Sequence, residues 1–321
     1  MILLTGGAGF IGSNLLGYLN EKNRKDIIIV DNIGNTIKDA NLVGLDYLDY
    51  VPKDDLWAWF TDEKIGKIES IIHLGACSNT LESNWDYLLE NNLNYTKKLW
   101  KLASEHQIPF LYASSAATYG SGSHSFSDDH ANLINFKPLN LYGDSKHLFD
   151  IWALEQSITP PRWYGLKYFN VYGPKETHKN RMASVVWHFI NQLKSGKNLK
   201  LFSGSHGYGD GEQKRDFIYV DDAVKVTYYL LENEVTSGIY NIGTGKARTF
   251  NSLARAIHKI EGSGEIEYVP FPEDLKSNYQ AFTEADIQKI RKSGFKSQLN
   301  PIEVGVQKYI KWIRAFGDKF Q

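Results

Sequence analysis

MILLTGGAGFIG, residues 1–12, is the stretch that decides the fold class. A short apolar run over residues 2–4 leads into glycines at positions 6, 9 and 12, and apolar residues follow at helical spacing up to residue 19. Glycines at this spacing let backbone N–H groups approach a pyrophosphate at the start of a helix. The stretch therefore predicts a buried strand, a phosphate-binding turn and a helix, in that order.

An acidic residue follows where a dinucleotide-binding unit needs one. Residues 26–31 form a second apolar run, which ends at Asp31, 19 residues after Gly12. A carboxylate at this distance bonds the ribose of an adenosine, so we predict dinucleotide binding, with a purely structural turn as the alternative. Asp31 favours NAD because it repels a 2′-phosphate, whereas Lys38 is close enough in the sequence to neutralise one. On residues alone the cofactor stays open between NAD and NADP.

Later apolar runs alternate with amphipathic stretches, which is typical of βαβ units and a parallel sheet. We expect an α/β fold, a Rossmann-type doubly wound parallel sheet with a smaller C-terminal α/β lobe that binds substrate. Residues 1–170 are expected to form the dinucleotide-binding domain, rejoined by segments near residues 215–245, and residues 171–321 mainly the substrate-binding lobe. The expected strands are residues 70–74, 109–114, 165–170, 214–220 and 238–243, the expected helices are residues 92–105 and 145–156, and residues 203–211 are expected to be a surface loop.

Composition and charge exclude several classes of protein. The chain has 321 residues, with 36 Lys and Arg against 37 Asp and Glu, which is not the balance of a nucleic-acid-binding surface. No basic and apolar leader opens the sequence and no apolar run approaches about 20 residues, so neither a signal peptide nor a membrane partner is expected. The single cysteine, Cys77, has no partner for an internal disulfide and fits the cytoplasm. We expect no metal site.

A tyrosine and a lysine four residues apart, Tyr142 and Lys146, are the candidate acid–base pair. Residues at this spacing share one face of a helix. A free tyrosine has a pKa of about 10, and lowering it by about 3 units takes roughly 4 kcal/mol, which a neighbouring ammonium can supply. Ser115, at the end of an expected strand, can bond the oxygen that Tyr142 deprotonates. The three residues predict a hydride-transfer site, with a surface pair as the alternative.

Several motifs carry a family resemblance. TGGAGFIGSN (residues 5–14), SSAATYG (114–120), YGDSK (142–146) and YFNVYGP (168–174) are similar to those of extended short-chain dehydrogenases/reductases that act on nucleotide sugars. HKNRMASVVWH (178–188), RDFIYVDD (215–222) and YQAFTEADI (279–287) resemble, more specifically, the ADP-glyceromanno-heptose 6-epimerase family. The resemblance runs from Met1 to beyond Lys308. It implies epimerisation at C6 of an ADP-heptose, a precursor for the inner core of lipopolysaccharide. It also implies NADP as the cofactor and a homo-oligomeric assembly, a pentamer.

The resemblance also implies roles for individual residues. It adds a second acid/base, Lys179, to Tyr142, Lys146 and Ser115. Cys77 is expected to pack beside the cofactor and not to act as a nucleophile. The implied substrate contacts are Ser115, Asn170, Lys179, Arg181, His188, Phe202, Ser203, Gly204, Ser205, Arg215 and Tyr279. The cofactor contacts, including the glycines of the turn, are Gly6, Gly9, Phe10, Ile11, Gly12, Asp31, Asn32, Lys38, Lys53, Leu74, Gly75, Ala76, Cys77, Ser78, Asn91, Tyr142, Lys146 and Val171.

Simpler interpretations exist for several of these residues. Asn170 is also compatible with a turn and His188 with packing on a helix, while Lys179 by itself would be an exposed charge. Arg215, by its own chemistry, suits a diphosphate because its planar guanidinium offers a fork of donors. The sequence departs from the family at Leu74, where Glu or Gln is frequent, at Asn180, where glycine is usual, and in the long loop 206–213.

Three rival functions remain. A nucleotide-sugar 4,6-dehydratase needs an acid pair after the serine-bearing strand, where this chain has Ala116 and Ala117, which cannot donate protons. A UDP-hexose 4-epimerase shares the Tyr–Lys pair, but it can use a single tyrosine because the whole sugar ring turns over, so Lys179 discriminates against it. An NAD(P)-sensing binding protein without catalysis would be expected to lose Tyr142 or Lys146, and both are present.

Overall fold

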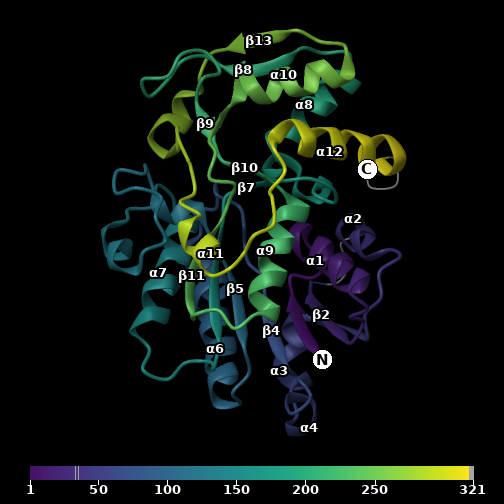
Figure 1. Cartoon of the computed structure of the whole chain (residues 1–321), viewed down its shortest axis with the longest axis vertical. Coiled ribbons are helices and arrows are strands. Elements are labelled where there is room, and N and C mark those ends of the chain that lie inside the picture. The colour runs from purple at the N-terminus through teal and green to yellow at the C-terminus, as the bar shows by residue number, and fades with distance from the viewer. Residues whose placement is uncertain (33, 35, 318–321) are drawn as a thin grey trace.

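The computed structural model describes residues 1–32, 34 and 36–317. Within these residues a seven-stranded parallel sheet, with the strand order β11-β6-β5-β4-β1-β2-β3, forms the centre of the larger lobe (Figure 1). Its strands are β1 (Ile2–Thr5), β2 (Ile27–Asp31), β3 (Asp49–Pro52), β4 (Ser70–His73), β5 (Phe110–Ser115), β6 (Trp163–Tyr168) and β11 (Gly238–Ile242). The Rossmann-type α/β fold expected from the sequence is confirmed.

The strand order reverses between β1 and β4, which lie side by side at the middle of the sheet. In an open α/β sheet, ligands bind outside the carboxyl ends of the strands at such a switch point, because the connections there leave toward opposite faces. Thr5 and His73 end these two strands, and the N–H of Leu74 donates to the carbonyl of Thr5 at 3.0 Å. The topology therefore places a crevice at the glycine turn.

Helices cover both faces of the sheet because its strands are apolar on both sides. Leu3 packs in one core with Trp100 of α6 and Phe149 of α7, whereas Leu4 packs in a second core with Leu15 of α1 and with residues of α9. These helices are α1 (Phe10–Glu21), α6 (Tyr95–Glu105), α7 (Leu141–Glu155) and α9 (Val220–Glu232). Shorter elements on this lobe are α2 (Thr36–Asp39), α3 (Leu56–Trp59), α4 (Asp62–Ile65), α5 (Trp85–Leu88), α11 (Gln288–Lys292), a π-helical segment (Leu89–Asn94) and 3₁₀ turns at Ala40–Leu42, Lys53–Asp55, Ala116–Tyr119 and His130–Asn135.

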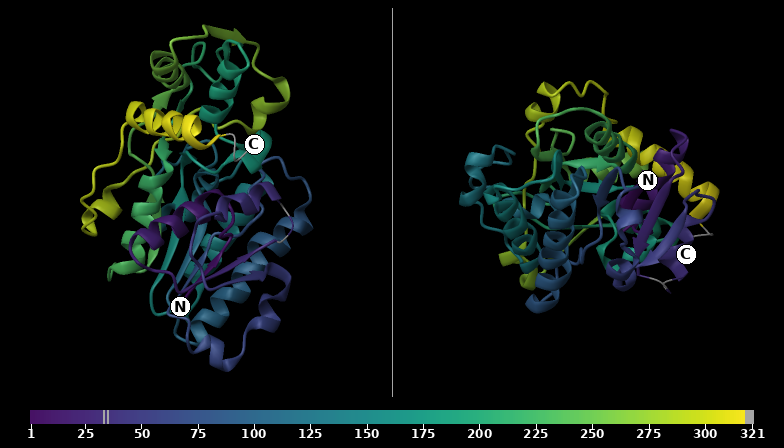
Figure 2. Two further views of the ribbon diagram at one scale, coloured as in Figure 1. Left: turned by 90° about the vertical axis from the view of Figure 1, so that its right-hand side faces the viewer. Right: turned by 90° about the horizontal axis from the view of Figure 1, so that it is seen from below.

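A smaller lobe lies beyond the carboxyl ends of the strands, at the top of Figure 1 and of the left view of Figure 2. It has a third hydrophobic core, which includes Trp187, Leu253 and Tyr309. Its helices are α8 (Val185–Lys194), α10 (Phe250–Glu261) and α12 (Ile302–Phe316), with 3₁₀ turns at Thr177–Met182 and Glu273–Asn278. Its strand pairs are β8 (Leu199–Phe202) with β13 (Ile266–Val269), β7 (Asn170–Tyr172) with β10 (Phe217–Tyr219), and β9 (Lys214–Arg215) with β12 (Arg248–Thr249).

Three sequence-based element predictions are wrong in detail. The strand expected over residues 165–170 is divided between two sheets, because β6 ends at Tyr168 and Asn170 begins β7. The single strand expected over residues 214–220 is two strands, because the chain changes partner at Asp216: β9 pairs antiparallel with β12, whereas β10 pairs parallel with β7. The buried Asp216 carboxylate fixes this change by accepting hydrogen bonds from Thr244 and the N–H of Ala285. The helix expected from residue 145 begins at Leu141, because Asn140 caps it.

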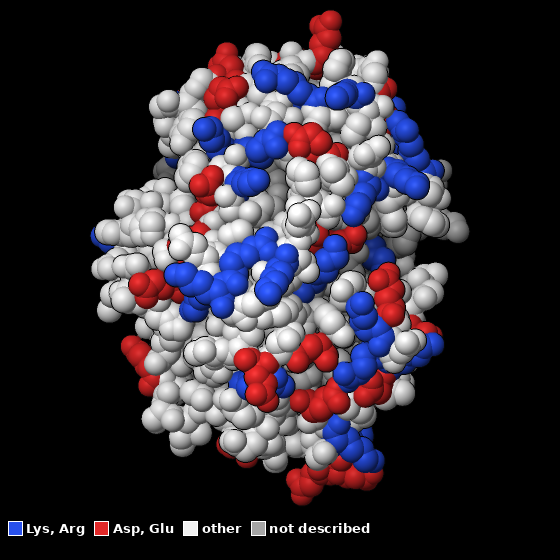
Figure 3. Space-filling model, viewed as in Figure 1, with Lys and Arg blue, Asp and Glu red and all other residues white. Residues whose placement is uncertain are grey.

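Both signs of charge are interspersed over the face of the molecule shown in Figure 3. Among the residues that the structure describes, no helix is long and apolar enough to cross a membrane. Within the same ranges, no group of three or more His, Cys, Asp or Glu side chains is arranged to hold a metal ion.

Candidate active site

The turn between β1 and α1 has a geometry that requires glycine. Gly6 has a φ of +69°, and a Cβ built on it would lie 2.6 Å from the backbone nitrogen of Gly75. A Cβ on Gly12 would lie 2.1 Å from the carbonyl oxygen of Gly6. Gly9 precedes α1 and has no side chain to cap its first N–H groups. Those donors and the positive end of the helix suit a phosphate, so the residues present fit a dinucleotide.

Asp31 ends β2 and is bonded to the glycine turn. Its Oδ2 accepts the N–H of Ala8 at 3.0 Å, and its Oδ1 accepts the N–H of Asn32 at 2.8 Å. The carboxylate, 6% exposed, also forms an ion pair with Lys38. An acid that can bond a ribose and a lysine that can meet a 2′-phosphate therefore lie side by side.

A cavity of about 430 Å³ opens at this end of the sheet. Two of its lining residues are joined, since Lys53 Nζ donates to Asn91 Oδ1 at 2.7 Å. The predicted cofactor residues that line it are Gly6, Gly9, Phe10, Ile11, Gly12, Asp31, Asn32, Lys38, Lys53, Leu74, Gly75, Ala76, Cys77, Ser78 and Asn91. Leu74, one of the departures from the family pattern, is thus a wall residue. The other three predicted cofactor residues, Tyr142, Lys146 and Val171, line an adjoining cavity of about 450 Å³.

Asn92 joins two walls of the site, although the sequence did not point to it. Its Oδ1 accepts the N–H of Cys77 at 2.8 Å, and its Nδ2 donates to the Cys77 carbonyl and to Ser145 Oγ, both at 3.0 Å. It lies in the π-helical segment, a rare conformation that is frequent at functional sites. The segment after β4 is therefore fastened to α7. Asn92 itself does not line the first cavity; the lining residues that the sequence did not predict are Thr5, Val30, Asn79, Tyr87, Tyr95, Ala113, Tyr168, His178 and Met182.

Tyr142 and Lys146 lie in the first two turns of α7. Asn140 starts the helix, because its Oδ1 accepts the N–H of Gly143 at 2.8 Å. The Lys146 side chain is 5% exposed, and its Nζ donates to the carbonyl of Ala113 at 2.9 Å. Both side chains line the second cavity, so the capped helix end aims the pair into this cavity.

Burial dominates the pKa values of this pair. It lowers the pKa of Lys146 to about 8, although the charges of Asp150 and Cys77 act in the opposite direction. Burial also raises the pKa of Tyr142 above its ordinary value, and a hydrogen bond with Ser115 offsets this only in part. The sequence led us to expect a depressed pKa for Tyr142; in this structure burial is the larger effect. Ser115, at the end of β5, also accepts the N–H of Ala117 at 3.2 Å.

Lys179 comes from the 3₁₀ turn Thr177–Met182 and lines both cavities. Its Nζ lies 5.2 Å from the ring centroid of Phe10. Burial lowers its pKa, while the Glu176 carboxylate raises it. Asn180, next in the chain, has a φ of +48° and a ψ of −119°, a backbone conformation that glycine adopts more easily. Asparagine therefore keeps, at some conformational cost, the turn for which glycine is usual in the resembling family.

The predicted substrate residues fall into two groups. Asn170 and Arg215 line the second cavity with Ser115 and Lys179, and the Arg215 guanidinium lies 4.8 Å from the ring centroid of Tyr279. Tyr279 is therefore linked to the site through Arg215. The predicted residues that line neither cavity are Arg181, His188, Phe202, Ser203, Gly204, Ser205 and Tyr279. His188 instead contacts the carbonyl of Arg181, with its Nε2 at 3.4 Å.

The fold and the glycine turn define a dinucleotide-binding α/β protein. Residues 2–243 match the model of the NAD dependent epimerase/dehydratase family, and the chain belongs to that family, whose cofactor is a nicotinamide dinucleotide.

Two relatives by sequence and one solved structure that are similar to this chain share a name. The chain is 46% identical, over the full length of both, to the ADP-L-glycero-D-manno-heptose-6-epimerase of Fusobacterium nucleatum subsp. nucleatum. It is 47% identical to the protein of that name from Alkalilimnicola ehrlichii, over 97% of this chain and 96% of the relative. The crystal structure of Helicobacter pylori ADP-L-glycero-D-manno-heptose-6-epimerase has a TM-score of 0.81 at 27% identity, covering 98% of this chain and 96% of the other.

Proposed function

We propose that this chain is an isomerase that converts ADP-D-glycero-β-D-manno-heptose into its C6 epimer, with NADP as the bound cofactor and NAD as the alternative. The names of relatives 46–47% identical over nearly their whole length support the substrate. The observation that carries the reaction type is that Tyr142 and Lys179, from two separate elements, line one cavity. Two acid/base groups are what an epimerisation outside the sugar ring requires.

The reaction needs a transient ketone because C6 carries no acidic proton. A bound nicotinamide cofactor supplies the hydride acceptor and then the hydride donor. Tyr142 or Lys179 accepts the proton of the C6 hydroxyl in the first half-reaction, and rotation about the C5–C6 bond presents the other face of the ketone. The second of the two residues then returns a proton to the oxygen, which now lies on the opposite side.

The remaining residues hold the reacting groups. Ser115 donates a hydrogen bond to the oxygen that gains and loses the proton, and the ammonium of Lys146 stabilises the phenolate of Tyr142. Arg215 binds the diphosphate with its guanidinium. Lys38, beside Asp31, would bind the 2′-phosphate of NADP, and we therefore prefer this cofactor over NAD. The proposal includes a cytoplasmic location and a homo-oligomer, a pentamer, which sedimentation analysis of the purified protein tests.

The experiment that tests the function uses the purified protein without added cofactor. We expect incubation with ADP-D-glycero-β-D-manno-heptose to give a mixture of both C6 epimers, resolved by NMR or anion-exchange chromatography. No conversion, even with added NADP⁺ and NAD⁺, would contradict the proposal. The same assay with UDP-hexoses tests the 4-epimerase, and the absence of any hydride exchange with every substrate would favour an NAD(P)-sensing binding protein.

A further inference from the structure

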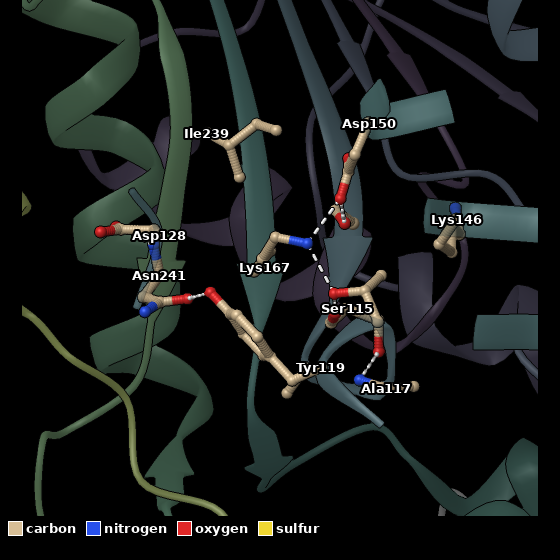
Figure 4. A network of polar contacts seen from close by, with 12 residues as sticks. Ser115, Ala117, Tyr119, Asp128, Lys146, Asp150, Lys167, Ile239 and Asn241 are labelled. Carbon is tan, nitrogen blue, oxygen red and sulfur yellow. Dashed lines mark hydrogen bonds and ion pairs between the residues drawn. The ribbon is translucent and has the colours of Figure 1, made fainter. Parts of the chain in front are cut away.

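Three side chains converge on one carboxylate behind the site. The Nζ of Lys167 lies 2.6 Å from Oδ2 of Asp150, and both side chains are 0% exposed. Ser114 Oγ donates to the same Oδ2 at 2.7 Å, and Tyr112 OH donates to Oδ1 at 3.0 Å. Figure 4 shows Lys167 reaching from its strand toward Asp150. Both oxygens of the Asp150 carboxylate therefore accept hydrogen bonds from neighbouring strands.

Lys167 has further partners on its other side. Its Nζ donates to Thr118 Oγ1 at 2.5 Å and lies 5.0 Å from the ring centroid of Tyr119. Tyr119 OH in turn donates to Asn241 Oδ1 at 2.6 Å, as Figure 4 shows. Two charges removed from water cost free energy that an apolar pair of the same volume would not, so such a pair is weak evidence for a purely stabilising role.

The geometry connects this carboxylate to the catalytic lysine. Asp150 and Lys146 are four residues apart on α7 and so share a face of the helix. Together they bind three consecutive residues of β5. Lys146 donates to the carbonyl of Ala113, while Asp150 accepts hydrogen bonds from the side chains of Tyr112 and Ser114 on either side of it. Burial lowers the pKa of Lys146, and the negative charge of Asp150 is the largest opposing effect.

We propose that Asp150 is a positioning residue whose buried carboxylate keeps Lys146 in the ammonium form beside Tyr142. The role of Lys146 in catalysis rests on the proposed function; the effect of Asp150 on its charge does not. The titratable groups that face Asp150 lie on several elements, and Lys146 also faces Cys77, after β4, and His73, at the end of β4. The groups that face Asp150 are Tyr112 on β5, Lys167 on β6, Tyr119 in the 3₁₀ turn after β5, His130 in the turn His130–Asn135, and Tyr142, Lys146 and His147 on α7.

A direct titration of Lys146 tests the proposal. In protein labelled with ¹³Cε-lysine, the NMR signal that disappears in Lys146→Met is followed against pH. In the wild-type protein we expect a midpoint near 8, and in Asp150→Asn a midpoint lower by about 1 unit or more, since an opposite charge at short range shifts a pKa by roughly 1–3 units. An unchanged midpoint in Asp150→Asn would overturn the proposal.

Tyr112→Phe is the matched control, because it removes the hydrogen bond to Oδ1 but keeps the Asp150 carboxylate and its ion pair with Lys167. We expect its Lys146 midpoint to stay near the wild-type value, and a fall like that of Asp150→Asn would show an effect of packing and overturn the proposal. If Asp150→Asn does not fold, Asp150→Asn/Lys167→Met, which leaves no unpaired buried charge, takes its place with the same expected fall.

The pH profile of epimerisation is the second readout. Lys146 must be protonated, so activity is lost as pH rises through its pKa, and this alkaline limb should move to lower pH in Asp150→Asn. The proposed function and the proposed role of Asp150 are tested by different results. A wild-type protein that does not epimerise ADP-heptose contradicts the proposed function, whereas the NMR midpoints decide the role of Asp150 in either case.

Discussion

The backbone N–H of Ala8 donates to the carboxylate of Asp31 at 3.0 Å, which ties the glycine turn to the end of β2. The same carboxylate is paired with Lys38. The acid that would bond a ribose is therefore partly neutralised before any ligand arrives. This arrangement lowers the repulsion that a lone aspartate would exert on a 2′-phosphate, and it makes the choice of cofactor depend on one lysine.

Lys38→Ala is expected to shift cofactor preference from NADP toward NAD. A hydrogen bond to a charged group contributes about 1.5–3 kcal/mol, so the affinity for NADP relative to NAD should fall at least about tenfold. The measurement is the NADP:NAD affinity ratio by calorimetry. Lys25→Ala removes an exposed lysine that is paired with Asp46 just before β2, and it should leave the ratio unchanged. An unchanged NADP:NAD affinity ratio in Lys38→Ala would contradict a role of Lys38 in binding the 2′-phosphate.

Tyr142→Phe is expected to lower kcat at least about 100-fold, because general acid–base groups contribute roughly 10²–10⁴-fold. The thermal midpoint should stay close to that of the wild-type protein, since the phenyl ring still fills the same space. Tyr47→Phe, at an exposed tyrosine, is the control and should keep full activity. Wild-type turnover by Tyr142→Phe would contradict the assignment of Tyr142 and Lys146 as the acid–base pair.

Lys179→Met is expected to lower kcat by a similar factor, with a smaller change in KM. The reason is that Lys179 handles the proton in one half-reaction while the phosphates are bound elsewhere. The measurement is kcat and KM for epimerisation in both directions. Lys197→Met, at an exposed lysine of the same lobe, is the control. A fully active Lys179→Met would show that Lys179 is not an acid/base group. It would then favour a 4-epimerase that uses a single tyrosine.

Local chemistry explains which parts of the candidate site could be predicted from the sequence. The glycine turn, Asp31 and the Tyr142–Lys146 pair each lie within a short stretch, and the structure places them at the two cavities. The start of α7 also follows from local chemistry, because Asn140 is a preferred N-cap residue.

Long-range contacts explain what was missed. Asn92 meets Ser145 across 53 residues, and β10 meets β7 only after the chain turns at Asp216. The pair of Lys167 and Asp150 joins a strand to a helix 17 residues away. No spacing or periodicity marks such partners, because the packing of the sheet alone brings them together.

Acid is expected to destabilise the protein through His73. This histidine is buried between Thr5 Oγ1, 2.6 Å from Nδ1, and Thr96 Oγ1, 2.9 Å from Nε2. Burial, aided by the charge of Lys146, lowers its pKa to about 3 from an ordinary 6.5. The unfolded chain therefore binds a proton that the folded one excludes, so stability is complete above pH 6.5 and is lost as the pH falls toward 3.

The loss from His73 should be roughly 2 kcal/mol of unfolding free energy between pH 6.5 and 5. Urea titrations at both pH values measure it. His73→Gln should reduce the difference by this amount, whereas His106→Gln, at an exposed histidine, should not. An equal pH dependence in wild-type protein and His73→Gln would contradict the argument.

Two glycines of α1 should respond in opposite ways to the same substitution. A Cβ on Gly12 would lie 2.1 Å from the carbonyl oxygen of Gly6, a backbone atom that cannot move without opening the turn, so Gly12→Ala should lower both stability and retained cofactor. At Gly17 the nearest atom is 3.6 Å away, on Leu45, so Gly17→Ala should raise stability by about 0.5–1 kcal/mol, the helix preference of alanine over glycine. Thermal midpoints and the cofactor content of the purified variants measure both effects. Equal behaviour of the two would mean that close packing of α1 on the turn does not explain the glycine at position 12.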